Sequence, residues 1–393
     1  MIQTLSELIR IPAIGPENGG DGESNKAERL MQILKSIGFD KIEKHDAEDD
    51  RVRPSGKRPN IVAYKYGEGT KEMLWIMTHL DIVPPGEESL WTVTKPFEPL
   101  VKDGKIYGRG SEDNMQSMIA SIFAVKALKN LGITPKRTIA LAFVADEEQG
   151  SKYGIQYLID QGLFKKDDLI IVPDSGNENG TFIEIAEKSA LWFRVCTTGK
   201  QTHASRPHMG LNAHRIGMEY ASALDKMLHE KYSAKDAYFD PPESTIEPTK
   251  KDKNVDAVNI IPGEDTLYFD CRILPNYDLG EMQRDIQTLA HEFEAKTGAK
   301  IKIEIVSKSV APTPTSADAR IVLMLKDAIK QNRGTEPKVG GIGGGTCAAF
   351  FRKINIPAVV WSTIDEMAHQ PNEYAKIENM VEDAKVYATI ATM

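Results

Sequence analysis

Histidine and acidic side chains follow several apolar segments of this chain, at positions where strands of a sheet would end. His79-Leu80-Asp81 comes directly after the apolar run 73–77. Residues i and i+2 of an extended chain point to the same side, so the Asp81 carboxylate can lie beside the His79 imidazole and fix its tautomer. Taken alone, this triplet fits a surface hydrogen bond equally well.

Three consecutive carboxylates, Asp146-Glu147-Glu148, end the most apolar run of the chain. Their mutual repulsion at the end of a buried strand is costly unless a cation is present, and a solvated loop is the alternative. Asp174 and His369 each follow a further apolar run. Nitrogen and oxygen ligands without thiolate suit zinc, cobalt or manganese, and two histidines favour zinc.

A glycine-punctuated turn at 108–113, GRGSED, ends in Asp113 and leads into a predicted helix over 114–131. By itself it fits a phosphate-binding turn or a simple left-handed turn.

The elements that must position these side chains are short apolar runs separated by helical patterns. The clearest runs are 73–77, 138–145, 169–172 and 358–361. Such runs predict strands of a mainly parallel α/β sheet with helices on both faces. Ligands of open α/β sheets bind at the carboxyl ends of the strands, so we expect the His and acidic residues to converge there.

The pattern changes between about residues 189 and 306. Strands are predicted at 190–198, 258–261, 266–273 and 300–306, and helices at 212–229 and 279–295. The order strand-helix-strand-strand-helix-strand is ferredoxin-like α+β. We therefore expect a catalytic metal-binding domain formed by 1–187 and 310–393, interrupted by an inserted domain over 188–309. The polar, proline-containing segment 231–253 is interpreted as an excursion from the inserted domain.

Composition excludes several classes of protein. The 393 residues are 41% hydrophobic and 27% charged, with a net charge of -8, which offers no basic face for nucleic acid. No secretory signal or membrane-spanning run is visible, so we expect a soluble cytoplasmic protein. The three cysteines lie far apart and predict neither disulfides nor a thiolate metal site.

A series of motifs in one order along nearly the whole chain resembles the metallopeptidase family of aminoacylase, carboxypeptidase G, peptidase T, the cytosolic dipeptidases and succinyl-diaminopimelate desuccinylase. The motifs are 78–84 (THLDIVP), 108–114 (GRGSEDN), 146–148 (DEE), 200–205 (KQTHAS), 210–213 (GLNA), 259–263 (NIIPG), 270–272 (DCR), 344–346 (GGT) and 369–373 (HQPNE).

The resemblance implies two divalent ions per chain, most readily zinc, with cobalt or manganese as alternatives. His79 and Asp174 would hold one ion, Glu148 and His369 the other, and Asp113 would bridge them. Two dications, three carboxylate ligands and one bridging hydroxide sum to zero charge, which a partly buried site tolerates.

The same resemblance implies roles for residues around the metals. Asp81 would orient His79, and Glu147 would be the general base for attack by a metal-bridged hydroxide on an amide or peptide C–N bond. A cis peptide is expected at Asp113–Asn114.

In the inserted domain, His203 would reach the oxyanion of the tetrahedral intermediate, often in a neighbouring subunit's site. The residues implied in substrate binding are Asn259, Arg272, Gly344, Gly345 and Thr346. The inserted domain would act as a lid and join a homodimer.

Two departures from the family pattern bear on the substrate. Many relatives carry Asp where this chain has Cys347, in a loop that helps to bind the substrate's carboxylate. Asp174, where many deacylases have Glu, favours a dipeptide or other small peptide substrate.

An N-acyl amino-acid deacylase, such as a succinyl-diaminopimelate desuccinylase, is the alternative within the family. An alternative of another class is a non-catalytic metal-binding protein, but such a protein would need only the metal ligands and not the additional carboxylate of Glu147. A nucleotide-binding protein built on the glycine run 340–346 would lack the Lys-Ser/Thr of a P-loop.

Overall fold

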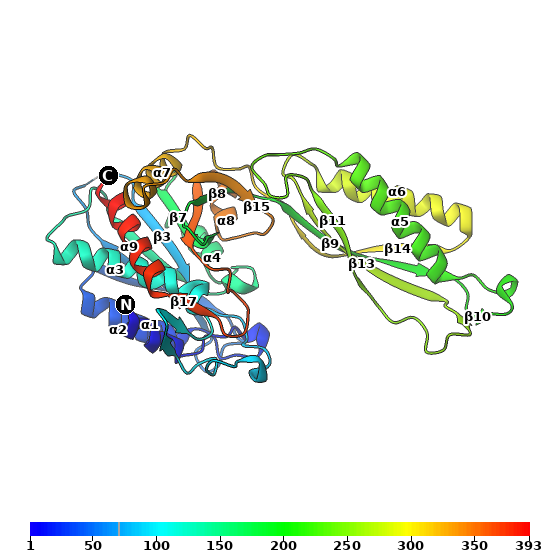
Figure 1. Cartoon of the computed structure of the whole chain (residues 1–393), viewed down its shortest axis with the longest axis horizontal. Coiled ribbons are helices and arrows are strands. Elements are labelled where there is room, and N and C mark those ends of the chain that lie inside the picture. The colour runs from blue at the N-terminus through cyan, green and yellow to red at the C-terminus, as the bar shows by residue number, and fades with distance from the viewer. Residues whose placement is uncertain (70) are drawn as a thin grey trace. The chain divides into compact units, whose positions relative to one another are not determined.

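The computed structural model describes residues 1–69 and 71–393, and it divides into two compact units (Figure 1). Unit 1 comprises Met1–Ile185, Pro314–Val339 and Thr346–Met393, and unit 2 comprises Ala186–Thr313 and Gly340–Gly345. The boundaries predicted from the sequence are 187/188 and 309/310. The short glycine segment joins unit 2 through backbone bonds: Lys188 N donates to Ile342 O (3.0 Å) and Gly341 N donates to Tyr238 O (2.6 Å).

Unit 1 is built on a large sheet with strands that differ in direction. The eight strands run in the order β1 (Lys41–Glu48), β2 (Lys57–Lys65), β6 (Ile139–Val144), β3 (Leu74–His79), β7 (Leu169–Asn177), β16 (Ala358–Thr363), β8 (Phe182–Glu187) and β15 (Lys338–Ile342). The central strands β6, β3, β7 and β16 are parallel, whereas β1 pairs with β2, β2 with β6, and β8 with β16 in antiparallel fashion. The predicted mainly parallel sheet is confirmed, with antiparallel strands toward its edges.

Helices cover both faces of this sheet (Figure 1). On one face, α3 (Ser117–Asn130), α7 (Arg320–Arg333) and α9 (Ile377–Thr392) pack together. On the other, α4 (Ile155–Asp160) and α8 (Ala348–Lys353) pack against side chains such as Trp75 and Met77 of β3. The helices α1 (Ile2–Ile9) and α2 (Ser24–Ile37) lie toward the β1–β2 edge. Every residue of β3 and β6 is buried, which explains their continuous apolar runs.

A small antiparallel sheet fixes the relation between two functional loops of unit 1. It consists of β4 (Leu100–Lys102), β5 (Lys105–Tyr107) and β17 (Tyr374–Lys376), in the order β17-β5-β4. Tyr374 pairs with Tyr107, so the chain after β5 and the chain before β17 run close together. These two stretches carry Asp113 and His369.

Unit 2 has the predicted ferredoxin-like order β9-α5-β11-β13-α6-β14. Its antiparallel sheet runs β11 (Thr245–Lys251), β13 (Glu264–Ile273), β9 (Ser189–Thr198) and β14 (Lys300–Ser309). Its helices are α5 (Ala213–Lys231), with Asn212 as N-cap, and α6 (Leu279–Thr297). The core between sheet and helices includes the stacked pair Phe193 and Phe269.

The second strand of unit 2 was predicted in the wrong place. It is β11, inside the segment 231–253 that the sequence analysis treated as an excursion. Most residues of β11 are exposed on the sheet edge, so they carry no apolar signal, and Pro248 sits where the register shifts. The predicted strand 258–261 is reduced to β12 (Ile260–Ile261), which pairs with β10 (Thr202–His203).

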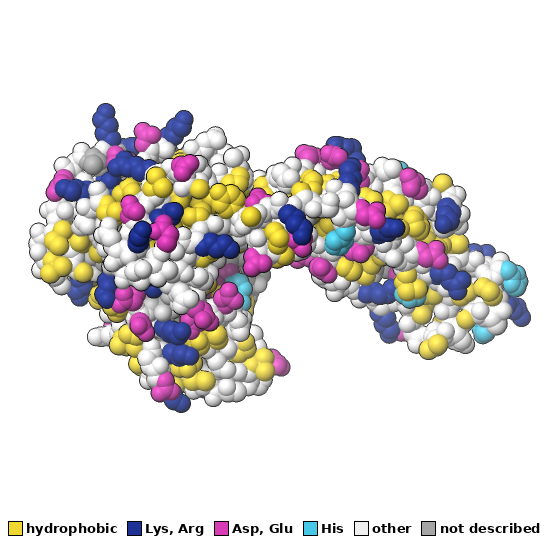
Figure 2. Space-filling view, turned by 45° about the horizontal axis from the view of Figure 1, so that its top comes forward, with side chains coloured by type: hydrophobic (Ala, Val, Ile, Leu, Met, Phe, Trp, Pro, Cys, Tyr) yellow, Lys and Arg dark blue, Asp and Glu magenta, His cyan; other side chains and the backbone are white. Residues whose placement is uncertain are grey.

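Acidic and basic side chains are intermingled on the face of both units shown in Figure 2. Among the described helices, none is long and apolar enough to cross a membrane.

Candidate metal centre

His79 ends β3 and is 2% exposed. Its Nδ1 lies 2.9 Å from the backbone carbonyl oxygen of Asp81 and 3.6 Å from the Asp81 carboxylate. The carboxylate instead accepts from the backbone N–H groups of Glu147 and Glu148, both at 3.1 Å. Asp81 thus contacts the imidazole through its carbonyl oxygen, with its carboxylate nearby, and the carboxylate links β3 to the acidic turn.

The acidic turn after β6 is sharp. Asp146 has a φ of 63°, in the left-handed region, and begins the short helical turn Glu147–Gln149. The Asp146 carboxylate accepts from Tyr153 N (3.1 Å) and lies 3.5 Å from a nitrogen of the fully buried Arg58. Asn and Asp tolerate this conformation better than most residues, and these partners hold it. The turn directs Glu147 and Glu148 toward the carboxyl end of the sheet.

The two histidines share one carboxylate, that of Asp113. Oδ1 of Asp113 lies 2.9 Å from Nε2 of His79, and its Oδ2 lies 3.1 Å from Nε2 of His369. Asp174 approaches His79 to 3.4 Å, and Glu148 approaches His369 to 3.1 Å. All five predicted ligand residues therefore meet, in two halves that are joined by Asp113. This is the arrangement that a bridging carboxylate between two ions requires.

Asp113 lies in an irregular turn between β5 and α3. The turn spans Ser111–Gln116, and Asp113 and Asn114 leave helical geometry within it, so the regular helix begins later than the predicted residue 114. The Asp113–Asn114 peptide is cis, as predicted. The side chain of Asn114 donates to Pro173 O (2.7 Å) and to Asp174 Oδ1 (3.0 Å), so this turn also orients the ligand on β7.

The donor set fits divalent cations. Nδ1 of His79 is engaged by the protein while its Nε2 faces carboxylates, which is the arrangement of a metal-binding imidazole. Candidate ligand atoms of His79, Asp113 and Glu148 lie within 4.8 Å of one another, as do those of His79, Glu147 and Asp174. Nitrogen and oxygen donors with no thiolate ligand match the predicted preference for zinc, cobalt or manganese.

The carboxylates of the site raise the pKa of both histidines. Burial lowers the pKa of His79, but hydrogen bonds to Asp113 and Asp174 outweigh it and raise that pKa well above its ordinary value. Hydrogen bonds to Asp113 and Glu148 raise the pKa of His369 to about 10. Both shifts arise from the carboxylates that surround the two imidazoles.

Glu147 faces the same site without being one of the five predicted ligands. Burial and the negative charge of Asp174 raise the pKa of Glu147 well above its ordinary value. The Sγ atom of Cys347 lies 3.8 Å from its Oε1 and 3.4 Å from Ser151 Oγ. Burial also raises the pKa of the Cys347 thiol, so it adds no charge beside Glu147. Cys347 thus lies against the candidate base.

Two buried glutamates at the site had no role in the sequence analysis. Glu373 is fully buried, and its carboxylate accepts from the backbone N–H groups of Gly110, Glu112 and Asp113 at 2.9–3.1 Å. The carboxylate of Glu112 accepts from the backbone of Asp365 and Met367. Both residues lie inside the quoted motifs, in polar stretches of sequence whose residue types give no sign that these two carboxylates are buried.

The predicted substrate-binding residues lie in unit 2, except Thr346. His203 is exposed in β10, and its Nδ1 accepts from Ser205 N (3.1 Å). Ala204 N donates to Asn259 O (2.8 Å), which places Asn259 beside the His203 turn. Arg272 in β13 donates to Gly343 O (3.2 Å), which places it beside the loop of Gly344 and Gly345.

Comparison with known proteins identifies the family. The model of peptidase family M20/M25/M40 matches residues 75–393. The chain belongs to this family. The M20 chain is 43% identical over 406 residues to an uncharacterized metallohydrolase of Methanocaldococcus jannaschii, covering 99% of this chain and 98% of that one. It is 27% identical over 386 residues to a succinyl-diaminopimelate desuccinylase of Nitratiruptor, covering 97% and 96%.

Solved structures of M20 proteins share the fold. An aminopeptidase PepT of Bacillus cereus matches with a TM-score of 0.77 at 18% identity, covering 100% of this chain and 97% of that chain. An M20 metallo-carboxypeptidase of Sulfolobus solfataricus matches with a TM-score of 0.73 at 20% identity, covering 99% and 98%. The predicted family and fold are confirmed. The M20 chain is a metal-dependent hydrolase that acts on amide or peptide bonds.

Proton release should accompany metal binding. Because imidazole must be neutral to bind a metal, zinc added to the metal-free protein at pH 7 should displace about two protons per chain from His79 and His369. Apparent affinity should rise with pH, since the competing protons leave these groups as the solution approaches their raised pKa values. Calorimetry in buffers of different ionisation enthalpy measures the protons. His369→Ala should release about one fewer, and release of none by the unaltered chain contradicts the assignment.

Proposed function

We propose that the chain hydrolyses the C–N bond of a dipeptide or small peptide at a centre of two divalent cations, with zinc the preferred metal. The observation that carries this proposal is the sharing of Asp113 between two imidazoles, with one oxygen toward His79 and the other toward His369. In this assignment His79 and Asp174 hold one cation, Glu148 and His369 hold the other, and Asp113 bridges them.

The chemistry divides between the cations and the chain's own residues. Two bound dications would supply acidification of a water molecule and polarisation of the scissile carbonyl group. Glu147 would accept the proton of the attacking water and return it to the leaving amine, giving a carboxylate and an amine. The Cys347 thiol beside Glu147 is neutral, so Glu147 would be a carboxylate without a second negative charge next to it. An Asp at position 347 would add such a charge.

Residues of unit 2 are assigned to the substrate. His203 would stabilise the oxyanion, and Asn259 and Arg272 would bind substrate polar groups together with the loop Gly344, Gly345 and Thr346. Support comes from contacts within unit 2: the turn of His203 binds the Asn259 backbone, and Arg272 binds Gly343.

Asp174 favours a peptide over an acylated amino acid. Its carboxylate is held by Asn114 at 3.0 Å and lies 3.4 Å from His79, so the short aspartate reaches the site without the extra methylene of glutamate. We infer that this leaves room beside one cation for the free amino group of a peptide.

A second candidate is removal of an N-acyl group from an amino acid. It is favoured by the relatives named succinyl-diaminopimelate desuccinylase, which align with nearly the full length of this chain. At 27% identity, these relatives support hydrolysis of an amide bond more strongly than they support succinyl as the acyl group that is removed.

Glu147→Gln should abolish turnover and retain both metals. The amide cannot accept a proton, so kcat should fall by roughly 10²–10⁴-fold while metal content per chain stays unchanged. The surface variant Glu98→Gln, at a side chain 69% exposed, is the matched control and should retain full activity. A fully active Glu147→Gln enzyme would remove the assigned base.

A substrate panel distinguishes the two candidates. The metal-loaded enzyme should cleave unblocked dipeptides with kcat/KM at least about tenfold above that for N-acetyl and N-succinyl amino acids, a difference of about 1.4 kcal/mol in transition-state binding. Amine release measured with a common colorimetric reagent gives the comparison. A reversed preference would replace the peptidase proposal by the deacylase.

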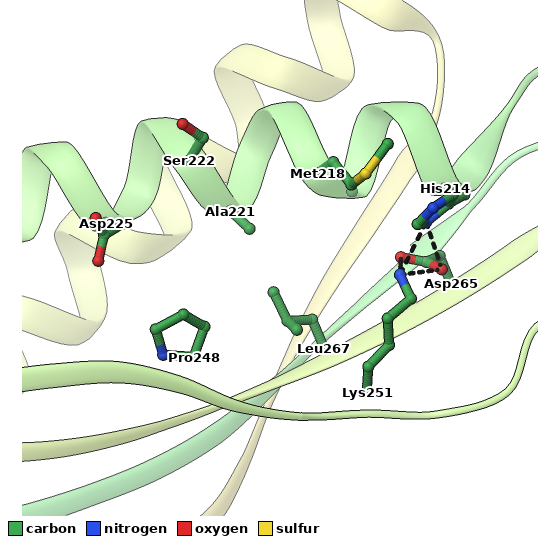
Figure 3. Close-up of a pocket in the computed structure, with 10 residues that line it drawn as sticks. His214, Met218, Ala221, Ser222, Asp225, Pro248, Lys251, Asp265 and Leu267 are labelled. Atoms are coloured by element: carbon green, nitrogen blue, oxygen red, sulfur yellow. Dashed lines mark hydrogen bonds and ion pairs between the residues drawn. The ribbon is translucent and has the colours of Figure 1, made fainter.

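We also propose a homodimer formed through unit 2. A groove of about 350 Å³ lies there between α5 and the strands β11 and β13, with the apolar side chains of Met218, Ala221 and Leu267 along it (Figure 3). At one end Asp265 is paired with His214 and Lys251. The groove borders β11, an edge strand of the four-stranded sheet, and an edge strand can pair with another copy of itself.

Sedimentation equilibrium tests the dimer. We expect a mass of about 87 kDa, twice the chain mass of 43.6 kDa. Met218→Lys should shift the equilibrium toward monomer, because it places a charge on an apolar contact surface. Leu323→Lys, at a comparably exposed apolar residue of unit 1, should leave the mass unchanged. A monomeric unaltered chain would contradict the proposal.

A further inference from the structure

Two loops that carry candidate ligands of unit 1 are joined by a pair of buried glutamates. Glu373 is 0% exposed. Its Oε2 accepts from Arg109 Nη1 (2.6 Å) and Gly110 N (2.9 Å), and its Oε1 accepts from Glu112 N (2.9 Å) and Asp113 N (3.1 Å). A single carboxylate from the His369 loop therefore organises the whole turn that presents Asp113.

The contact is reciprocal. Glu112, 4% exposed, belongs to the Asp113 turn, and its carboxylate accepts from Asp365 N (2.6 Å) and from Met367 N. Each loop thus sends one carboxylate to bind backbone N–H groups of the other. We call Glu112 and Glu373 the reciprocal clasp.

The clasp acts beside the pairing of β5 with β17 and adds side-chain hydrogen bonds at a ligand loop with unusual backbone geometry. The side chain of His369 is 55% exposed, and its backbone φ of 65° lies in the sparsely populated left-handed region. Arg109, 2% exposed, donates to Glu373 and also to the carbonyl oxygen of His369 at 3.4 Å, which links the clasp to the ligand's own backbone. Hydrogen bonds with a charged partner such as the Arg109 guanidinium are among the stronger ones, so they can hold this conformation.

We propose that Glu112 and Glu373 are positioning residues that fix the distance between Asp113 and His369 and so determine occupancy of the cation shared by these two ligands. The inference rests on the proposed two-cation centre. Neither clasp carboxylate touches the ligand atoms of Asp113 or His369, so the effect passes through the backbone. Zinc sites tolerate ligand displacements of only about 0.2 Å, and partners outside the ligand set typically change metal affinity by roughly 10–100-fold.

The test is Glu373→Gln. The amide keeps the size of the side chain but turns a nitrogen toward backbone N–H groups that need an acceptor. Zinc titration of the metal-free protein by calorimetry should show one of two sites lose roughly 10–100-fold in affinity, while the other changes much less. The d–d spectrum of the cobalt-loaded protein should change at that site, and excess zinc should restore kcat. Glu373→Asp, which keeps the charge, should retain more of the affinity than the amide.

Glu184→Gln is the matched control. Glu184 is 0% exposed and pairs with Arg352 at 2.9 Å, so its loss removes a comparable buried charge from unit 1. Its zinc affinities should stay unchanged. If Glu373→Gln does not fold, Glu112→Gln tests the other half of the clasp with the same readouts.

The outcomes separate the two proposals. If the unaltered chain binds two zinc ions and a folded Glu373→Gln variant keeps both zinc affinities, the role of the clasp alone is overturned. An unaltered chain that binds one cation would overturn the two-cation centre and the clasp with it.

Discussion

The structure depends on one constraint: several carboxylates lie close together at one edge of a buried sheet. Asp113, Glu147, Glu148 and Asp174 converge there, and burial raises the pKa of both Glu147 and Glu148. Carboxylates packed this closely favour positive charge nearby, and they raise the pKa of both His79 and His369. Divalent cations would supply more charge in the same space and return both histidines to their neutral, ligating form. The same crowding gives a physical basis for metal dependence and places the Glu147 carboxylate, the proposed base, at this edge of the sheet.

The scaffold meets this constraint by dividing the work between the sheet and the loops. β3 and β7 carry His79 and Asp174 on buried strands, which fixes one half of the centre rigidly. The other half depends on turns with unusual backbone: a left-handed residue at Asp146 and another at His369. Carboxylates outside the proposed ligand set hold these turns. Asp81 binds the acidic turn, and the reciprocal clasp joins the loops of Asp113 and His369.

Sequence patterns predicted the parts of the structure that burial dictates. The central strands could be predicted because both of their faces are covered, which makes their sequences continuously apolar. The polar residues at their ends could be predicted because they end those apolar runs. The edge strand β11 was missed, since exposed edge residues and Pro248 carry no such pattern. The clasp was missed for a different reason: apart from Arg109, the partners of Glu112 and Glu373 are backbone N–H groups, which residue types do not reveal. The Asp81 carboxylate lies 3.6 Å from the His79 ring, and the shorter contact to that ring comes from the Asp81 carbonyl oxygen, which residue types cannot predict.

The central claim is that Asp113 lies between two cations. Anomalous diffraction from zinc-loaded crystals, recorded on both sides of the zinc edge, tests it directly. The account predicts two peaks per chain, about 3.5–4 Å apart, with one oxygen of Asp113 toward each. His79 and Asp174 should flank one peak, and Glu148 and His369 the other. A single peak, or two peaks that do not share Asp113, would contradict it.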